Sequence, residues 1–232
     1  MAEVKHPVRH TSQNELVIER AKDFWTKYGK TTTIVAAAII ILGGGWLAYK
    51  YMIVAPKQQK AEEAIWRAQD YFSQDSLDKA LKGDGQSAGF ERIASQYKGT
   101  DAGELANYYV GVIALKQGDN SKAIKYLKSF STSAPQVQAR AYKLLGDAYA
   151  NSGKNADALA SYKKAAHEFE KDKVNSSDYL MYAAYFADKV LNDKKQAEEL
   201  YKEIITKFPN SQPSDDAGKF LAQMGVYKVE DK

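Results

Sequence analysis

Small residues recur at fixed spacings in the second half of this 232-residue chain, and that period constrains the fold more than any other feature. Gly111 and Ala123 lie 12 residues apart, and so do Gly146 and Ala158, which come 35 residues later. A large side chain follows each alanine of the series by four positions: Leu127, Tyr162 and, after Ala197, Tyr201. A period of about 35 residues is typical of helical hairpins that bury their apolar faces only by stacking on one another.

The most regular unit, residues 139–172, resembles the tetratricopeptide repeat. Seven positions match that repeat in register: Tyr142, Leu145, Gly146, Tyr149, Ala158, Tyr162 and Ala165. Glu170 stands where the repeat has a proline, whereas Pro135 and Pro209 keep that position in the units before and after. The resemblance implies an all-α solenoid of three to four repeats, and we expect a last helix with Ser214 as its N-cap to close it.

The resemblance also explains the small residues. A glycine in mid-helix costs about 1 kcal/mol relative to alanine, so Gly146 is expected where a second helix comes close. We expect it to face the turn that carries Ala158. The predicted packing positions of the repeats are Gly111, Ala123, Gly146, Ala158 and Ala197.

In tetratricopeptide repeats the first helix of each pair lines a concave face through its positions 2, 5 and 9. The resemblance therefore implies a protein-binding groove lined by Leu105, Tyr108, Val112, Arg140, Lys143, Asp147, Tyr179, Tyr182 and Phe186. Rigid aromatic side chains mixed with charges suit the binding of extended, sequence-diverse segments. The alternative is that the last aromatics turn inward as core, because the register of the last repeat could slip by one, with Tyr185 at its glycine position.

An apolar segment precedes the repeats. Ile34 to Val54 is 21 residues, which as a helix matches a hydrocarbon layer of about 30 Å. Since no small-x-small cleavage site follows, we predict an uncleaved transmembrane helix over 31–54, between a tail of residues 1–30 and a domain of residues 55–232. The near-equal numbers of basic residues on its two sides leave the orientation open.

Small residues also share one face of this apolar segment, at Ala37, Gly44 and Ala48. Such a face allows another membrane helix to approach closely, so a transmembrane helix contact is expected there. The alternative is that alanine and glycine are simply common in such helices.

Composition excludes several other functions. The chain has no cysteine, which rules out disulfides and thiolate metal sites. From Ala55 onward it carries 26 basic and 25 acidic residues, so the domain has no basic excess for nucleic acid.

No catalytic or cofactor motif is evident either. Gly29-Lys30-Thr31 copies the end of a phosphate-binding loop, but Phe24 stands where that motif requires glycine. His6 and His10 lack the further ligands that a metal site needs. We therefore expect no enzyme, cofactor or metal, and an enzyme with an unrecognised site is the remaining alternative.

The order of segments resembles one family. Residues 21–30, then Gly45-Trp46 within the span, then the Gln/Lys-rich residues 57–64 are similar to the ancillary SecYEG translocon subunits of YfgM type. The insertion at 73–89 and the regularity of unit 139–172 depart from that family. The resemblance implies a cytoplasmic tail, one helix in the bacterial inner membrane and a periplasmic domain.

This resemblance also implies a set of partners. They are the SecYEG translocon, a periplasmic chaperone or peptidyl-prolyl isomerase, and unfolded client chains that the protein helps to hand on. The alternative is a scaffold that assembles other cell-envelope complexes.

Overall fold

The computed structural model describes residues 13–227, and every regular element in that range is helical, as expected. The chain divides into two compact units, residues 1–56 and 57–232. In chain order the elements are α1 (Gln13–Tyr49), the π-helical turn η1 (Lys50–Val54), α2 (Ala55–Ser73), α3 (Leu77–Lys82), α4 (Phe90–Gln96), α5 (Asp101–Lys116), α6 (Asn120–Ser129), α7 (Pro135–Asn151), α8 (Asn155–Glu168), α9 (Lys173–Lys189), α10 (Lys194–Lys207) and α11 (Gln212–Gln223).

The first unit consists of the apolar helix. The helical stretch from Lys22 to Ser73 contains an 18-residue window of mean hydropathy 1.8, none of which is buried. It is therefore long and apolar enough to span a membrane. A side chain built at Gly44 would meet nothing within 4 Å, so the small-residue face has no partner within the described part of the chain. The helix contact expected there stays a prediction.

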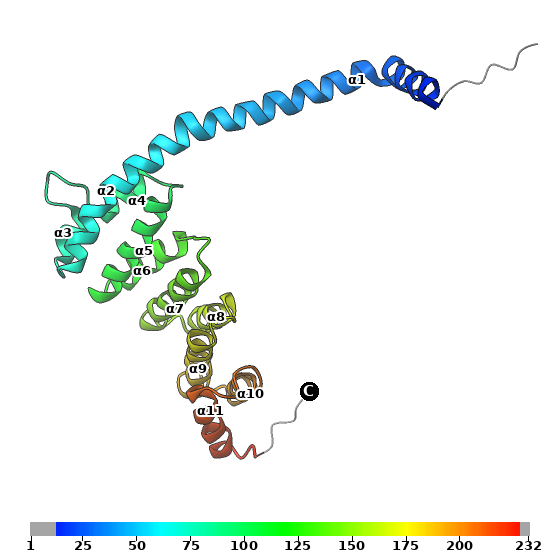
Figure 1. Ribbon diagram of the computed structural model, residues 1–232. Coiled ribbons are helices and arrows are strands. Elements are labelled where there is room, and N and C mark those ends of the chain that lie inside the picture. Colours follow the sequence, from blue (N-terminus) through cyan, green and yellow to red (C-terminus); the bar gives the residue numbers. More distant parts are fainter. Residues whose placement is uncertain (1–12, 228–232) are drawn as a thin grey trace, which may run out of the picture. The chain divides into compact units, whose positions relative to one another are not determined.

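The second unit is a series of helices that pack on their neighbours in sequence, from α4 on α5 through to α10 on α11 (Figure 1). Its buried residues form three successive clusters, centred on α2 to α5, on α5 to α7, and on α8 to α11. Because each hairpin contacts chiefly the next one, the stability of this unit is shared among neighbouring interfaces. This is the stacked-hairpin architecture that the 35-residue period predicts.

The glycines of the repeats lie at close helix contacts. A Cβ atom at Gly111 would come within 2.5 Å of Leu127 Cγ, and one at Gly146 within 2.5 Å of Tyr162 Cε1. Any larger residue at either position would therefore have to displace the side chain on the facing helix. The atoms nearest to a Cβ at Gly146 belong to the ring of Tyr162, one turn beyond Ala158 on α8. The alanine packing positions Ala123, Ala158 and Ala197 are fully buried.

The last repeat has a shifted register. Four residues, 190–193, connect α9 to α10, whereas three residues make the equivalent connection in each of the two preceding repeats. The extra residue moves the small position from Tyr185 to Ala184, which is 0% exposed, while Tyr185 is 50% exposed. Phe186 then corresponds to the buried Ile113 and Ala148, two positions beyond the glycines.

Side-chain hydrogen bonds order the insertion after α2 and the start of the last helix. In the insertion between α2 and α4, the Asp84 carboxylate accepts hydrogen bonds from the backbone N–H groups of Ser87 (2.6 Å) and Gln86 (2.9 Å) and from the Tyr71 hydroxyl (2.7 Å). At the other end of the second unit, the N-cap of α11 lies three residues earlier than expected, at Ser211 and not at Ser214. Ser211 is its N-cap, because the Ser211 hydroxyl accepts a hydrogen bond from the Ser214 N–H.

Candidate protein-binding surface

The first helices of the three clear repeats, α5, α7 and α9, carry the predicted groove residues. On α5 all three predicted residues are half-buried: Leu105, Tyr108 and Val112. On α7 one is exposed, Arg140, and two are half-buried, Lys143 and Asp147. On α9 the three differ, with Tyr179 half-buried, Tyr182 exposed and Phe186 buried. We call the surface formed by these three helices the first-helix face. The side chains at some of the predicted positions are accessible to a partner, and those at others are buried.

Arg140 on α7 lies near tyrosines of both neighbouring first helices. Burial raises the pKa of Tyr108 on α5 and of Tyr179 on α9, and the Arg140 guanidinium on α7 opposes that rise in both. One cation therefore lies near a tyrosine from each neighbouring repeat. Beside it, Lys143 Nζ is 2.9 Å from the Asp147 carboxylate and 4.7 Å from the centre of the Tyr182 ring.

Phe186 corrects the predicted groove. Only 8% of it is exposed, and its ring packs edge-on against Tyr162 with centroids 5.5 Å apart. The register shift explains this, since Phe186 occupies a core position of the repeat. The equivalents of the groove positions in the last repeat are then Asp178, Met181 and Tyr185.

Sequence reasoning missed these three residues because it carried the 12-residue spacing into the last repeat. One feature of the sequence did indicate the shifted register. A tyrosine at the glycine position is incompatible with the close helix contact seen at Gly146, so the register had to move.

A groove lies between α9 and α11, with a cavity volume of about 550 Å³, and we call it the α9–α11 groove. It is lined by Asp178, Met181, Tyr182, Tyr185, Asp216, Lys219, Phe220 and Gln223. The rings of Tyr185 and Phe220 meet edge-on at 6.2 Å. The lining thus combines four apolar or aromatic side chains with four charged or amide ones.

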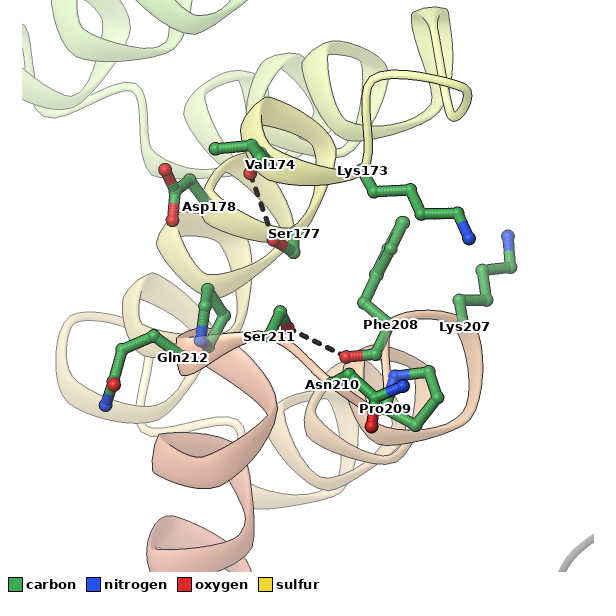
Figure 2. A pocket seen from close by; sticks show the side chains of 11 residues that line it. Lys173, Val174, Ser177, Asp178, Lys207, Phe208, Pro209, Asn210, Ser211 and Gln212 are labelled. Atoms are coloured by element: carbon green, nitrogen blue, oxygen red, sulfur yellow. Dashed lines mark hydrogen bonds between the residues drawn. The ribbon is translucent and has the colours of Figure 1, made fainter.

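A second hollow of about 360 Å³ opens between the start of α9 and the segment that joins α10 to α11, and we call it the α9–α10 hollow (Figure 2). Val174, Phe208 and Pro209 supply apolar surface to it. In Figure 2 the side chains of Lys173 and Lys207 lie on one side of this hollow and that of Asp178 lies on the other. Asp178 also lines the α9–α11 groove, so the two depressions adjoin.

One cluster has the composition of a metal site. Single ligand atoms of His167, Glu170 and Glu203 lie within 4.8 Å of one another. Lys207 already pairs with both carboxylates, at 2.7 Å from Glu170 and 3.0 Å from Glu203, and its hydrogen bond, followed by that of His167, holds the pKa of Glu170 below its ordinary value. The cluster is therefore an ion-pair network between α8 and α10. His6 and His10 lie outside the described residues.

Stacked helical hairpins with an exposed first-helix face define a helical-repeat protein of the kind that binds other proteins. Comparison with protein families agrees: the tetratricopeptide repeat-like domain matches residues 22–141, and tetratricopeptide repeats match residues 111–173 and 178–211. Because the first match covers more than half of the chain, the protein belongs to the tetratricopeptide repeat-like domain family. No curated protein matches the chain.

Proposed function

We propose that this protein is an accessory subunit of the SecYEG translocon that helps to pass emerging chains to periplasmic chaperones. Membership of a tetratricopeptide repeat-like family implies an adaptor that acts by binding proteins. The observation that carries the proposal is the exposed aromatic and charged surface of α7 and α9, in a chain that also has a helix of membrane-spanning length.

Two further observations support the proposal. The matched tetratricopeptide repeat-like domain begins at Lys22, so it includes the apolar helix together with the first repeats. The resemblance of residues 21–64 to ancillary SecYEG subunits supplies the choice of partner. A membrane anchor beside a secretion channel would keep a weak binding surface at high local concentration near emerging segments.

Co-purification of the full-length chain tests this function. A tagged protein extracted in mild detergent should retain SecY, SecE and SecG together with a periplasmic chaperone, as identified by mass spectrometry. A matched preparation in which residues 31–54 are replaced by an unrelated membrane helix measures how much retention depends on the anchor. Recovery of other envelope complexes without SecY would favour the scaffold role instead.

Topology provides a second test. We propose that residues 1–30 face the cytoplasm and residues 55–232 the periplasm of the inner membrane. A protease added to cells with a permeabilised outer membrane should then degrade the repeat domain and spare a tag at the N-terminus. A repeat domain that survives behind an intact inner membrane would reverse the orientation and end the proposed periplasmic role.

A further inference from the structure

Exposed apolar side chains gather on α9. Val174 is 71% exposed, and Tyr182 and Tyr185 are each 50% exposed. Exposed apolar side chains that gather in one patch often mark an interaction site, whereas scattered ones do not. Val174 lines the α9–α10 hollow, and the two tyrosines line the α9–α11 groove. One helix therefore supplies apolar surface to both depressions.

Asp178 stands between the two depressions and lines both. Its carboxylate makes no ion pair or hydrogen bond within residues 13–227. Burial, followed by repulsion from Asp172, raises the pKa of Asp178 above its ordinary value. Asp178 is an exposed residue, so its carboxylate is open to a cation of a partner, and a pair formed within about 4 Å there is partly screened by water.

Two of the three lysines near Asp178 already pair with other acids, and the third, Lys173, makes no ion pair within residues 13–227. Lys219 pairs with Asp216 at 2.8 Å, and Lys207 pairs with Glu170 and Glu203. Lys173 lies across the α9–α10 hollow from Asp178 (Figure 2).

Asp172, the other acidic group near Asp178, is the N-cap residue of α9. Its carboxylate caps α9 by accepting a hydrogen bond from the Asn175 N–H at 3.2 Å. Asp178 is thus the acidic group of this surface that lacks a partner within the part of the chain that the structure describes.

We propose that this surface binds an extended segment of a partner protein in which a lysine or arginine is flanked by apolar or aromatic residues. The basic side chain pairs with Asp178, and the flanking side chains fill the α9–α11 groove and the α9–α10 hollow. The inference rests on the proposed role in protein binding and adds the chemistry of the bound segment. The anchor residues of such contacts are aromatic side chains in pockets, and the charge pair sets the selectivity.

Binding of synthetic peptides to the full-length chain in lipid nanodiscs tests the inference. The probes are three fluorescein-labelled nonapeptides of Gly and Ser that carry two phenylalanines around a central lysine, glutamine or glutamate. By fluorescence anisotropy we expect the lysine peptide to bind about three- to tenfold more tightly than the glutamate peptide, as a partly screened charge pair allows. The difference should shrink as the salt concentration rises.

Variants assign the preference to one residue. Asp178→Asn should reduce the affinity for the lysine peptide about threefold, and Asp178→Lys should reverse the preference between the lysine and glutamate peptides. Glu199→Gln removes the same charge from an exposed position on α10 and is the matched control. It should leave the preference intact. Tyr185→Ser should weaken all three peptides together, because it removes apolar surface rather than charge.

The outcomes separate this inference from the proposed function. Equal binding of the three peptides, unchanged by the Asp178 variants, would overturn the selectivity while leaving capture of unfolded chains in place. If none of the three peptides binds, the inference is wrong. The translocon role would then still be tested separately, by whether SecY co-purifies with the chain. If Tyr185→Ser instead abolishes a concentration-dependent dimer of the chain, the surface is covered by a second copy and the inference falls.

Discussion

The middle repeat (α7 and α8) and the last repeat (α9 and α10) both have a tyrosine at the same position of their second helix, but the two hydroxyl groups have different surroundings. The hydroxyl of Tyr162 donates a hydrogen bond to the Asp147 carboxylate at 3.0 Å. The hydroxyl of Tyr201 is buried and has no hydrogen-bond partner within the described residues. The residue after the small position explains the contrast, because it is Asp147 in the middle repeat and Tyr185 in the last one.

This difference shows how the same repeat fold can either bury its polar groups in a network or expose an aromatic side chain. In the middle repeat Lys143, Asp147 and Tyr162 form a connected polar network, and such networks fix the packing around them. In the last repeat the equivalent of Asp147 is an exposed aromatic ring that lines the α9–α11 groove. That repeat gives up a hydrogen bond and presents apolar surface, which is consistent with a binding role.

The largest effect is expected from Gly146→Leu. Its side chain would enter the space held by the Tyr162 ring, so we expect a loss of about 3 kcal/mol or more in the free energy of unfolding. The control is Ala184→Gly at the equivalent position of the last repeat, which should cost about 1 to 2 kcal/mol through helix propensity and the loss of a buried methyl group. Thermal or urea unfolding followed by circular dichroism measures both. If Gly146→Leu is as stable as the parent, Gly146 does not lie at a close helix contact.

A second pair of variants tests the register of the last repeat. Ala184→Leu should cost about 2 kcal/mol because it overpacks a fully buried position, whereas Tyr185→Ala should change stability by less than about 1 kcal/mol. The same unfolding measurement compares them. A greater cost for Tyr185→Ala than for Ala184→Leu would mean that Tyr185, and not Ala184, takes the glycine position.

The two tyrosines give the most direct test of the comparison. Tyr162→Phe should cost about 1 kcal/mol because it removes a hydrogen bond to a carboxylate. Tyr201→Phe should be neutral or slightly stabilising, since the parent buries an unsatisfied hydroxyl. Equal losses in the two variants would show that Tyr201 does have a partner.

The smallest effect concerns the junction between the two repeats, where Glu170 replaces the usual proline. Its folded pKa is lowered, chiefly by the hydrogen bond from Lys207 and then by that from His167, so ionised Glu170 stabilises the fold above its ordinary pKa of 4.5. This contribution is lost as the pH falls through the lowered folded pKa. Because the group is partly exposed, we expect Glu170→Gln to remove at most about 0.5 kcal/mol at pH 7.

Stability of Glu170→Gln and the parent from pH 7 to pH 3 measures this effect. The difference between the two proteins should narrow toward pH 3, where Glu170 becomes protonated in the parent as well. A difference that widens with acid would contradict the assigned role of the Lys207 pair.

The regular repeats could be predicted from the sequence because their signals are local. Gly111 and Gly146 are costly in a helix, so they indicate a close contact wherever the rest of the repeat is apolar. Their partners, Leu127 and Tyr162, could not be assigned from spacing alone. A residue on the facing helix lies opposite the glycine through the crossing geometry of the two helices, which the order of residues does not specify.

The sequence by itself determined the all-α repeat architecture, the apolar helix and the lack of cysteine chemistry, since each follows from composition or from a period that packing must respect. Only the tertiary structure decided which aromatics are accessible. One additional residue between α9 and α10 rotates the face that α9 presents, and this buries Phe186 and exposes Tyr185. Successive helical positions differ by about 100° in direction, so a shift of one residue exchanges a core position for a binding position.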